Sequence, residues 1–280
     1  MPRPFQLDTP AGRRLHGLLD LPARHGPQPW PTVVVCHGFK GFMDWGFFPH
    51  LAELLADRGF LAVRFNLSGA GVRPGEDLVG DVAAFRDDTY SKEVEDLGAV
   101  LDALPAITGG CADGRRVGLF GHSRGGAVAL LAAAHPDHGA RVRCLVTWAA
   151  IGEVDRWSAE EKERWRREGA ITVTNARTGQ VLPLGRALLE DVERHRQALD
   201  LVAAARRRTA PWLLVHGRQD ESVPAAEGER LAGAATEPRE LVLVDDAGHT
   251  FGATHPFAHP TPQLTAAMNA TQGWFRRHLA

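Results

Sequence analysis

Three side chains suited to nucleophilic catalysis follow apolar segments of this chain. Ser123 lies in Gly121-His-Ser-Arg-Gly125, between an apolar run and an alanine-rich run, and Asp220 and His249 each follow a later apolar run. A serine hydroxyl attacks a carbonyl poorly until a base takes its proton, and that base needs a partner that fixes its tautomer and stabilises its charge. The chain supplies all three groups, which predicts acyl transfer through a serine-bound intermediate.

The segment around Ser123 predicts a strand, a sharp turn and a helix. Residues 116–120 read as the strand, and residues 127–134 are almost all strong helix formers. The flanking glycines avoid collisions that larger side chains would make in so tight a turn. The serine would then stand at a helix N-terminus, where free N–H groups and the helix dipole favour negative charge.

Two backbone N–H groups are predicted to stabilise the charge that develops on the carbonyl oxygen. One is that of Arg124, directly after the serine, and the other is that of Phe39, just after the apolar run 32–36. The alternative is that His37-Gly38 is an ordinary turn at the end of a strand.

The acid and the base each have rivals. Asp245 and Asp246 are acidic and near a strand end, but they lie only a few residues before His249 on the same loop, so Asp220 is the preferred acid. His249 follows Gly248 immediately after a strand and is the preferred base.

The remaining strand-end histidines, His37 and His216, are expected to brace turns. His255 and His259 have a metal-binding spacing, but Pro256 breaks the helix that this spacing requires, so no metal is expected. Pro74 occupies the place of the third glycine in a dinucleotide-binding motif, and no cofactor is expected either.

Apolar runs alternate with amphipathic segments along most of the chain. This alternation predicts a mostly parallel eight-stranded sheet with helices on both faces. The elements expected from it are a hairpin over 5–21, strands at 32–36, 60–65, 116–120, 142–151, 211–217 and 240–244, and helices at 48–58, 91–104 with Ser91 as its N-cap, 225–234 and 262–279.

The alternation breaks at Gly152. Residues 158–168 predict a short charged helix, 171–182 a hairpin and 186–207 a long helix, so we expect a core of residues 1–151 and 206–280 with a small helix-hairpin cap insertion at 152–205. Trp157 and Trp165 are eight residues apart, roughly two helical turns. They either line the pocket opposite Phe39 or pack the cap onto the sheet.

Composition limits the classes of partner. The net charge of -2 gives no electrostatic argument for binding nucleic acid or an anionic membrane surface. No apolar stretch is long enough to span a membrane and the start lacks a secretory signal, so a cytoplasmic protein is expected. Cys36 and Cys144 are predicted buried thiols and Cys111 a loop residue. The oligomeric state is open, with a homodimer as one option.

The chain resembles the α/β-hydrolases over nearly its full length, through His37-Gly-Phe-Lys-Gly41, Gly121-His-Ser-Arg-Gly125, Asp220 and Gly248-His249. The turn, the serine motif and the small cap are similar to those of cinnamoyl and feruloyl esterases and dienelactone-hydrolase-like proteins. Dienelactone hydrolases proper use a cysteine nucleophile, and haloalkane dehalogenases and epoxide hydrolases an aspartate, where this chain has Ser123.

The resemblance implies the α/β-hydrolase fold and a serine carboxylesterase acting on a small-molecule ester with a short, medium or aromatic acyl group. Peptidase and acyltransferase activity stay open because they use the same acyl-enzyme. A non-catalytic binding protein is disfavoured, because no member of the triad is missing.

Overall fold

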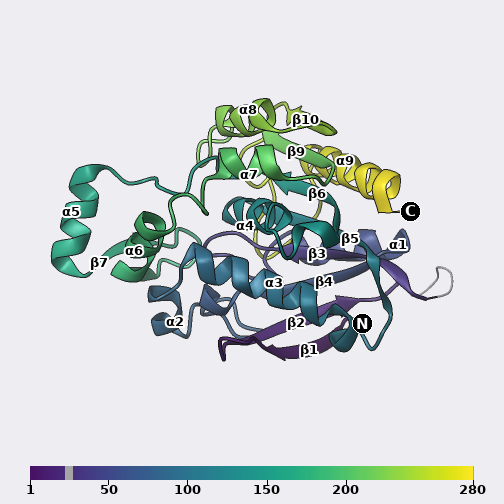
Figure 1. The fold of residues 1–280 in the computed structure, drawn as a ribbon, viewed down its shortest axis with the longest axis horizontal. Helices are drawn as coiled ribbons and strands as arrows, with labels where there is room; N and C mark the ends of the chain where they lie inside the picture. The colour runs from purple at the N-terminus through teal and green to yellow at the C-terminus, as the bar shows by residue number, and fades with distance from the viewer. Residues whose placement is uncertain (23–27, 280) are drawn as a thin grey trace.

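A computed structural model describes residues 1–22 and 28–279, and an eight-stranded sheet forms its centre (Figure 1). The strand order is β1-β2-β4-β3-β5-β6-β9-β10. The pairs β1/β2 and β2/β4 are antiparallel and the other neighbours are parallel, which confirms the predicted mostly parallel sheet. The strands are β1 Arg3–Asp8, β2 Arg14–Asp20, β3 Trp30–Cys36, β4 Leu61–Asn66, β5 Ala112–His122, β6 Val142–Trp148, β9 Trp212–Gly217 and β10 Arg239–Val244.

Helices cover both faces of the sheet. Successive side chains of a strand point to opposite faces, and in the central strands both sets are apolar and need a cover. In β3, Val33 and Val35 belong to one apolar cluster and Val34 and Cys36 to the other. The first cluster also contains side chains of α1 (Phe48–Asp57) and α9 (Pro262–Leu279). The second contains those of α3 (Tyr90–Ile107), α4 (Arg124–Ala133), α7 (Leu201–Arg207) and α8 (Ala225–Ala234). Strands buried on both faces explain why their sequences are apolar without alternation.

The start of α3 differs from the sequence prediction. The side chain of Thr89 accepts a hydrogen bond from the Lys92 N–H at 3.2 Å and caps the helix, so Ser91 is not the N-cap. The N–H of Ser91 instead donates to the carboxylate of Asp191 at 3.1 Å. The preceding threonine is an equally good local cap, and the contact with Asp191 is too distant in the sequence to be anticipated.

The prediction of one long helix over 186–207 was wrong. It is two helices, α6 (Arg186–Arg194) and α7, with an irregular stretch between them. Asp200 begins α7 by accepting a hydrogen bond from the Ala203 N–H at 2.9 Å. An aspartate that caps a new helix competes with continuation of the old one, although the apolar spacing continues across the break. Similarly, β6 ends at Trp148 and not at residue 151, because Ala149 has a φ of 46°.

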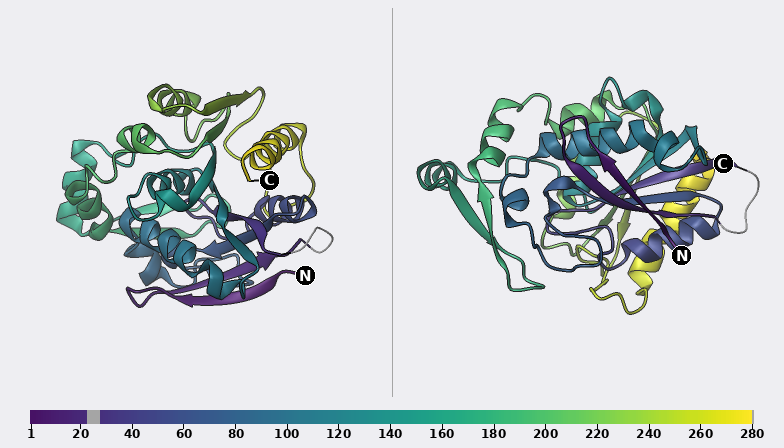
Figure 2. Two further views of the ribbon diagram at one scale, coloured as in Figure 1. Left: turned by 45° about the vertical axis from the view of Figure 1, so that its right-hand side comes forward. Right: turned by 90° about the horizontal axis from the view of Figure 1, so that it is seen from below.

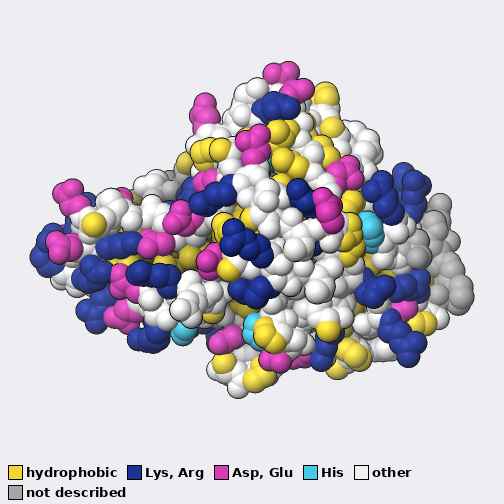
Figure 3. Space-filling view, turned by 45° about the horizontal axis from the view of Figure 1, so that its top comes forward, with side chains coloured by type: hydrophobic (Ala, Val, Ile, Leu, Met, Phe, Trp, Pro, Cys, Tyr) yellow, Lys and Arg dark blue, Asp and Glu magenta, His cyan; other side chains and the backbone are white. Residues whose placement is uncertain are grey.

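Between β6 and α7 the chain projects away from the sheet. This part contains α5 (Ala159–Glu168), the hairpin of β7 (Ala170–Thr174) and β8 (Val181–Gly185), and α6 (Figure 2). Figure 3 shows side chains of both charges crowded over the end of the molecule that carries α5. The division into a core and a cap at 152–205 stays a prediction, since α7 crosses the boundary at 205 and packs on α4 and α8.

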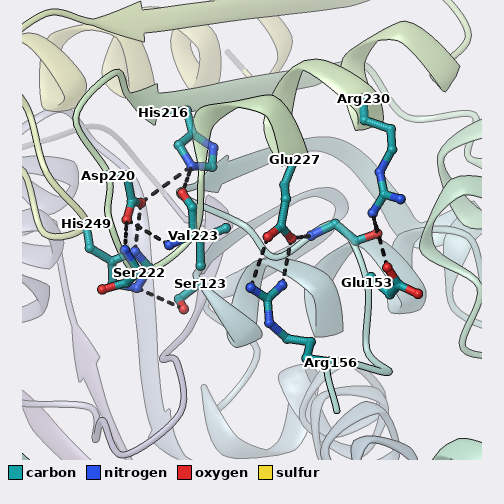
Figure 4. Close-up of polar contacts among 11 residues, drawn as sticks. Ser123, Glu153, Arg156, His216, Asp220, Ser222, Val223, Glu227, Arg230 and His249 are labelled. Carbon is teal, nitrogen blue, oxygen red and sulfur yellow. Dashed lines mark hydrogen bonds and ion pairs between the residues drawn. The ribbon is translucent and has the colours of Figure 1, made fainter. Parts of the chain in front are cut away.

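The projecting segment is fastened to α8 where it leaves the sheet. Glu227 accepts two hydrogen bonds from the guanidinium of Arg156, at 2.7 and 2.9 Å, and one from the Gly152 N–H at 2.6 Å. Arg230 in turn donates to the carbonyl of Gly152 at 2.7 Å (Figure 4). A bidentate arginine and carboxylate fixes direction as well as distance, so this contact defines where the segment begins.

The sequence analysis also made predictions about the three cysteines and about membrane-spanning segments. Cys36 and Cys144 are buried and Cys111 is partly exposed, and all three are free thiols, as predicted. Across residues 1–22 and 28–279, no helix combines the length and the apolar character that a bilayer crossing requires.

Candidate active site

Ser123 lies in a strained turn between β5 and α4. Its backbone has φ 57° and ψ -123°, a conformation that costs a non-glycine residue free energy, and such residues concentrate at functional sites. A Cβ on Gly121 would lie 2.3 Å from the carbonyl oxygen of Gly125, and one on Gly125 would lie 2.2 Å from that of His37. The two glycines therefore permit the turn sterically, as the sequence predicted.

Ser123, His249 and Asp220 form one chain of hydrogen bonds (Figure 4). The Nε2 atom of His249 lies 3.0 Å from the Oγ of Ser123, and its Nδ1 lies 2.8 Å from the Oδ2 of Asp220. Since a carboxylate only accepts, Nδ1 carries the proton and Nε2 is free to accept from the serine hydroxyl. The three residues follow β5, β9 and β10, whose carboxyl ends meet at one edge of the sheet.

Asp220 is held as a carboxylate. Burial raises the pKa of Asp220, but hydrogen bonds from His216, His249 and the backbone N–H of Val223 together hold it well below the usual range. Its Oδ1 accepts from the N–H groups of Ser222 and Val223, both at 2.9 Å. The second oxygen is thus left to face His249.

Two histidines were not predicted to take part in this arrangement. The Nε2 of His216 lies 2.8 Å from the carbonyl of Val223, which braces the turn as expected, but it also lies 3.4 Å from the Oδ2 of Asp220. The Nε2 of His122, next to the serine, donates to the carbonyl of His249 at 2.9 Å. Burial lowers the pKa of His122 to about 3, so it stays neutral and holds the His249 loop.

The rival residues have other partners. Asp245 is exposed and pairs with Arg218 at 2.6 Å, and Asp246 is exposed as well. His37 is buried, and its two ring nitrogens contact Gly38 and Leu67 of neighbouring turns. His255 accepts from the Gly46 N–H at 2.9 Å. Within the described part of the chain, no three His, Cys, Asp or Glu side chains are grouped as metal ligands would be.

The backbone N–H groups of Phe39 and Arg124 have no acceptor within residues 1–22 and 28–279. Both residues flank the serine: Arg124 is the first residue of α4, and Phe39 shares with Ser123 the lining of one cavity. A Cβ on Gly38 would lie 3.1 Å from the Cβ of Ser123, so the loop before Phe39 lies directly against the serine turn. Unpaired N–H groups beside a nucleophile can bind a developing oxyanion.

The cavity at Ser123 has a volume of about 300 Å³. Phe39, Trp45 and Phe48 give it an aromatic wall, and Ser123 and His249 lie in it. The residues that close it from the projecting segment are those of the hairpin turn, Asn175, Ala176 and Arg177. A larger hollow of about 520 Å³ between α3, α4 and α7 contains none of the three triad residues.

Trp157 and Trp165 do not line this cavity. Trp165 is fully buried and its Nε1 donates to the carbonyl of Leu184 at 2.8 Å, while the ring of Trp157 packs edge-on against it with centroids 4.9 Å apart. Of the two roles considered, these rings have the packing one, because Trp165 in α5 faces the hairpin and Trp157, just before α5, packs on the Trp165 ring.

Residues 33–267 match the alpha/beta hydrolase family. The chain belongs to this family. The match confirms the fold and the family that the sequence motifs predicted. This alpha/beta hydrolase is 31% identical over 248 residues to the uncharacterized protein Rv2307c of Mycobacterium tuberculosis. The aligned region covers 88% of this chain and 72% of that protein.

Solved structures of esterases share the fold. Est1E from Butyrivibrio proteoclasticus superposes with a TM-score of 0.69 at 19% identity, covering 98% of each chain. The esterase domain of a Rhodothermus marinus protein superposes with a TM-score of 0.68 at 21% identity and full coverage of both chains. This alpha/beta hydrolase therefore has esterases among its structural neighbours.

Proposed function

We propose that this alpha/beta hydrolase is a serine carboxylesterase in which Ser123 is the nucleophile, His249 the base and Asp220 the residue that orients the base. The observation that carries the proposal is the continuous hydrogen-bond chain from the Ser123 Oγ through His249 to Asp220, at 3.0 and 2.8 Å. A serine and histidine in contact, with the histidine held by a third group, is the arrangement that activates a hydroxyl.

In the proposed reaction the Ser123 Oγ attacks the ester carbonyl while its proton passes to the Nε2 of His249. The carbonyl oxygen becomes an oxyanion, which the N–H groups of Phe39 and Arg124 stabilise. His249 then gives the proton to the departing alcohol, and an acyl group stays on Ser123. A water molecule then attacks the acyl group while His249 takes its proton. His249 returns that proton to the Ser123 Oγ as the acid leaves.

Asp220 contributes through charge and orientation. Being buried and ionised, it stabilises the imidazolium that forms during each half-reaction and holds the proton on Nδ1. His216 and the two backbone N–H donors fix its position. The pair does not require Asp220 to accept the proton itself.

The cavity favours a small-molecule ester with a short, medium or aromatic acyl group. A volume of about 300 Å³ holds a group of modest size, and aromatic walls pack well on flat acyl groups. One solved structure of Est1E contains ferulic acid, an aromatic acid, which supports this class by analogy. We assign the choice of substrate to the hairpin turn at Asn175–Arg177 together with the wall at Phe39.

The proposal is tested with matched p-nitrophenyl esters and peptide anilides that carry the same acyl group. The unchanged protein should hydrolyse the esters faster, and Ser123→Ala should abolish turnover. Ser222→Ala is the matched control, because Ser222 contacts the site only through its backbone N–H. Faster turnover of anilides, or transfer to added alcohols that outpaces hydrolysis, would replace the esterase with a peptidase or an acyltransferase.

A further inference from the structure

The side chain of Arg124 is buried beneath the serine turn. Only 5% of the residue is exposed, although arginine is among the least often buried residues. Its Nε donates to the Oε2 of Glu93 at 2.8 Å and its Nη2 to the Oδ2 of Asp88 at 3.1 Å. Glu93 lies in the first turn of α3 and Asp88 lies just before that helix, so this side chain joins the first residue of α4 to the start of a neighbouring helix.

The same guanidinium lies over two aromatic rings. Its central carbon is 4.1 Å from the ring centroid of Tyr90 and 5.4 Å from that of Phe39. The ring of Phe39 also stacks on the ring of Phe85, with the two centroids 5.6 Å apart. Guanidinium groups over aromatic faces are attractive, more so when desolvated. Arg124 therefore contacts the side chain of the residue whose backbone N–H is the other proposed oxyanion donor.

Burial and the guanidinium act in opposite directions on the pKa values of the two acids of this cluster. Burial raises the pKa of Glu93 well above its usual value and raises that of Asp88, and the charge of the Arg124 guanidinium opposes both shifts. One guanidinium therefore faces two buried carboxyl groups and holds both in place.

Stability alone does not account for such a cluster. Replacing a buried ion pair with apolar side chains of similar volume is often neutral or stabilising, so burial of Arg124 is weak evidence for a stabilising role. Its position is more informative, because one residue supplies a backbone N–H to the site and a side chain that contacts the other donor loop.

We propose that the Arg124 side chain is a positioning residue, which fixes the Phe39 N–H relative to its own through its ion pairs with Glu93 and Asp88 and its contact with the Phe39 ring. The proposal rests on the proposed esterase function. The side chain touches no substrate and acts only through the two backbone donors.

The test compares Arg124→Lys with the unchanged protein. Lysine keeps the charge but loses the planar fork and the stacking. Removing one oxyanion donor outright costs about 10²–10³ in kcat, so displacing one should lower kcat by about 10-fold or more while KM changes less than about 2-fold. A trifluoromethyl ketone, whose adduct with Ser123 places an oxyanion between the donors, should bind more weakly by the same factor as kcat/KM falls. Arg13→Lys is the matched control, since Arg13 pairs with Glu95 and Asp96 on the same helix and should leave all three values unchanged.

A second variant covers the case in which Arg124→Lys does not fold. Phe39→Leu keeps the backbone N–H and removes only the ring, so it should show the same loss in kcat and in ketone affinity. In the double variant the two losses should not add, because both break one contact. Additive losses, or a fall in kcat without a matching fall in ketone affinity, would overturn the positioning role. Ester hydrolysis by the unchanged protein separates the two proposals. If the unchanged protein hydrolyses no ester, both proposals fail. If it does, and the variants keep its kcat and ketone affinity, only the positioning role of Arg124 fails.

Discussion

Replacing Asp220 with asparagine changes one atom of the proposed relay. The Oδ1 of Asp220 accepts hydrogen bonds from the N–H groups of Ser222 and Val223, so the amide oxygen of asparagine must take that place. Its NH₂ group then faces the Nδ1 of His249, where the Oδ2 now lies at 2.8 Å. A donor at this position forces the proton of the histidine onto Nε2, which can no longer accept from Ser123.

The expected loss is large and confined to the chemistry. The wrong tautomer lowers kcat by about 10⁴, or about 5.4 kcal/mol at 1.36 kcal/mol for each factor of ten. The two backbone hydrogen bonds to residue 220 survive, so circular dichroism and the denaturant midpoint should change little. Stopped-flow or steady-state hydrolysis of p-nitrophenyl butyrate gives kcat and KM separately.

Asp246→Asn and Asp245→Asn are the controls, since both carboxylates are exposed. They should retain nearly full activity. An Asp220→Asn protein with more than about a tenth of the original kcat, or a comparable loss in Asp246→Asn, would refute the assignment of Asp220.

Further changes test the remaining parts of the account. Gly125→Ala should lower the free energy of unfolding by about 3 kcal/mol in urea titrations, because its Cβ would lie 2.2 Å from the carbonyl of His37, whereas Gly273→Ala, with open space around it, should not. Glu93→Gln should flatten the dependence of that free energy on pH. The raised pKa of Glu93 means that the unfolded chain loses its proton first, so the free energy of unfolding falls as pH rises from the unfolded pKa near 4.3 through the folded pKa. A free energy of unfolding of the unchanged protein that rises over this window would contradict the raised pKa. Arg177→Ala should alter the rank order of kcat/KM across an ester series, because the hairpin turn lines the cavity, while Trp165→Phe should lower stability and leave the order unchanged. The opposite pattern would return substrate choice to the tryptophans.

The sheet and the grouping of Ser123, Asp220 and His249 were predictable because each depends on a local pattern and a general rule. Strands buried on both faces have apolar sequences that stand out, and parallel strands bring their carboxyl ends to one edge. Ser123, Asp220 and His249 each follow such a strand, so sequence order and topology suffice to place them together. The fold therefore brings the three residues to one edge of the sheet, and the loops after β9 and β10 set their contact distances.

Contacts between side chains distant in the sequence were not predictable. His216 was expected only to brace a turn, and its approach to Asp220 depends on the course of the loop between them. The acids that pair with Arg124 lie more than thirty residues before it, one in α3 and one just before that helix, so its side chain gave no signal beyond an arginine after a serine. The two tryptophans pack on each other, Trp165 from α5 and Trp157 from just before it, but their spacing does not say whether they meet the cavity or the hairpin. Orientation of a helix about its axis is set by packing that a single sequence does not reveal.

Covalent labelling of the nucleophile tests the central claim most directly. The chain contains five serines, so the site of a fluorophosphonate adduct can be assigned without ambiguity by peptide mass spectrometry. We expect one adduct per chain, on Ser123, formed rapidly in the folded protein, lost in Ser123→Ala and slowed strongly in His249→Ala. A folded protein that gains no adduct on Ser123, or that is labelled equally fast without His249, would contradict that claim.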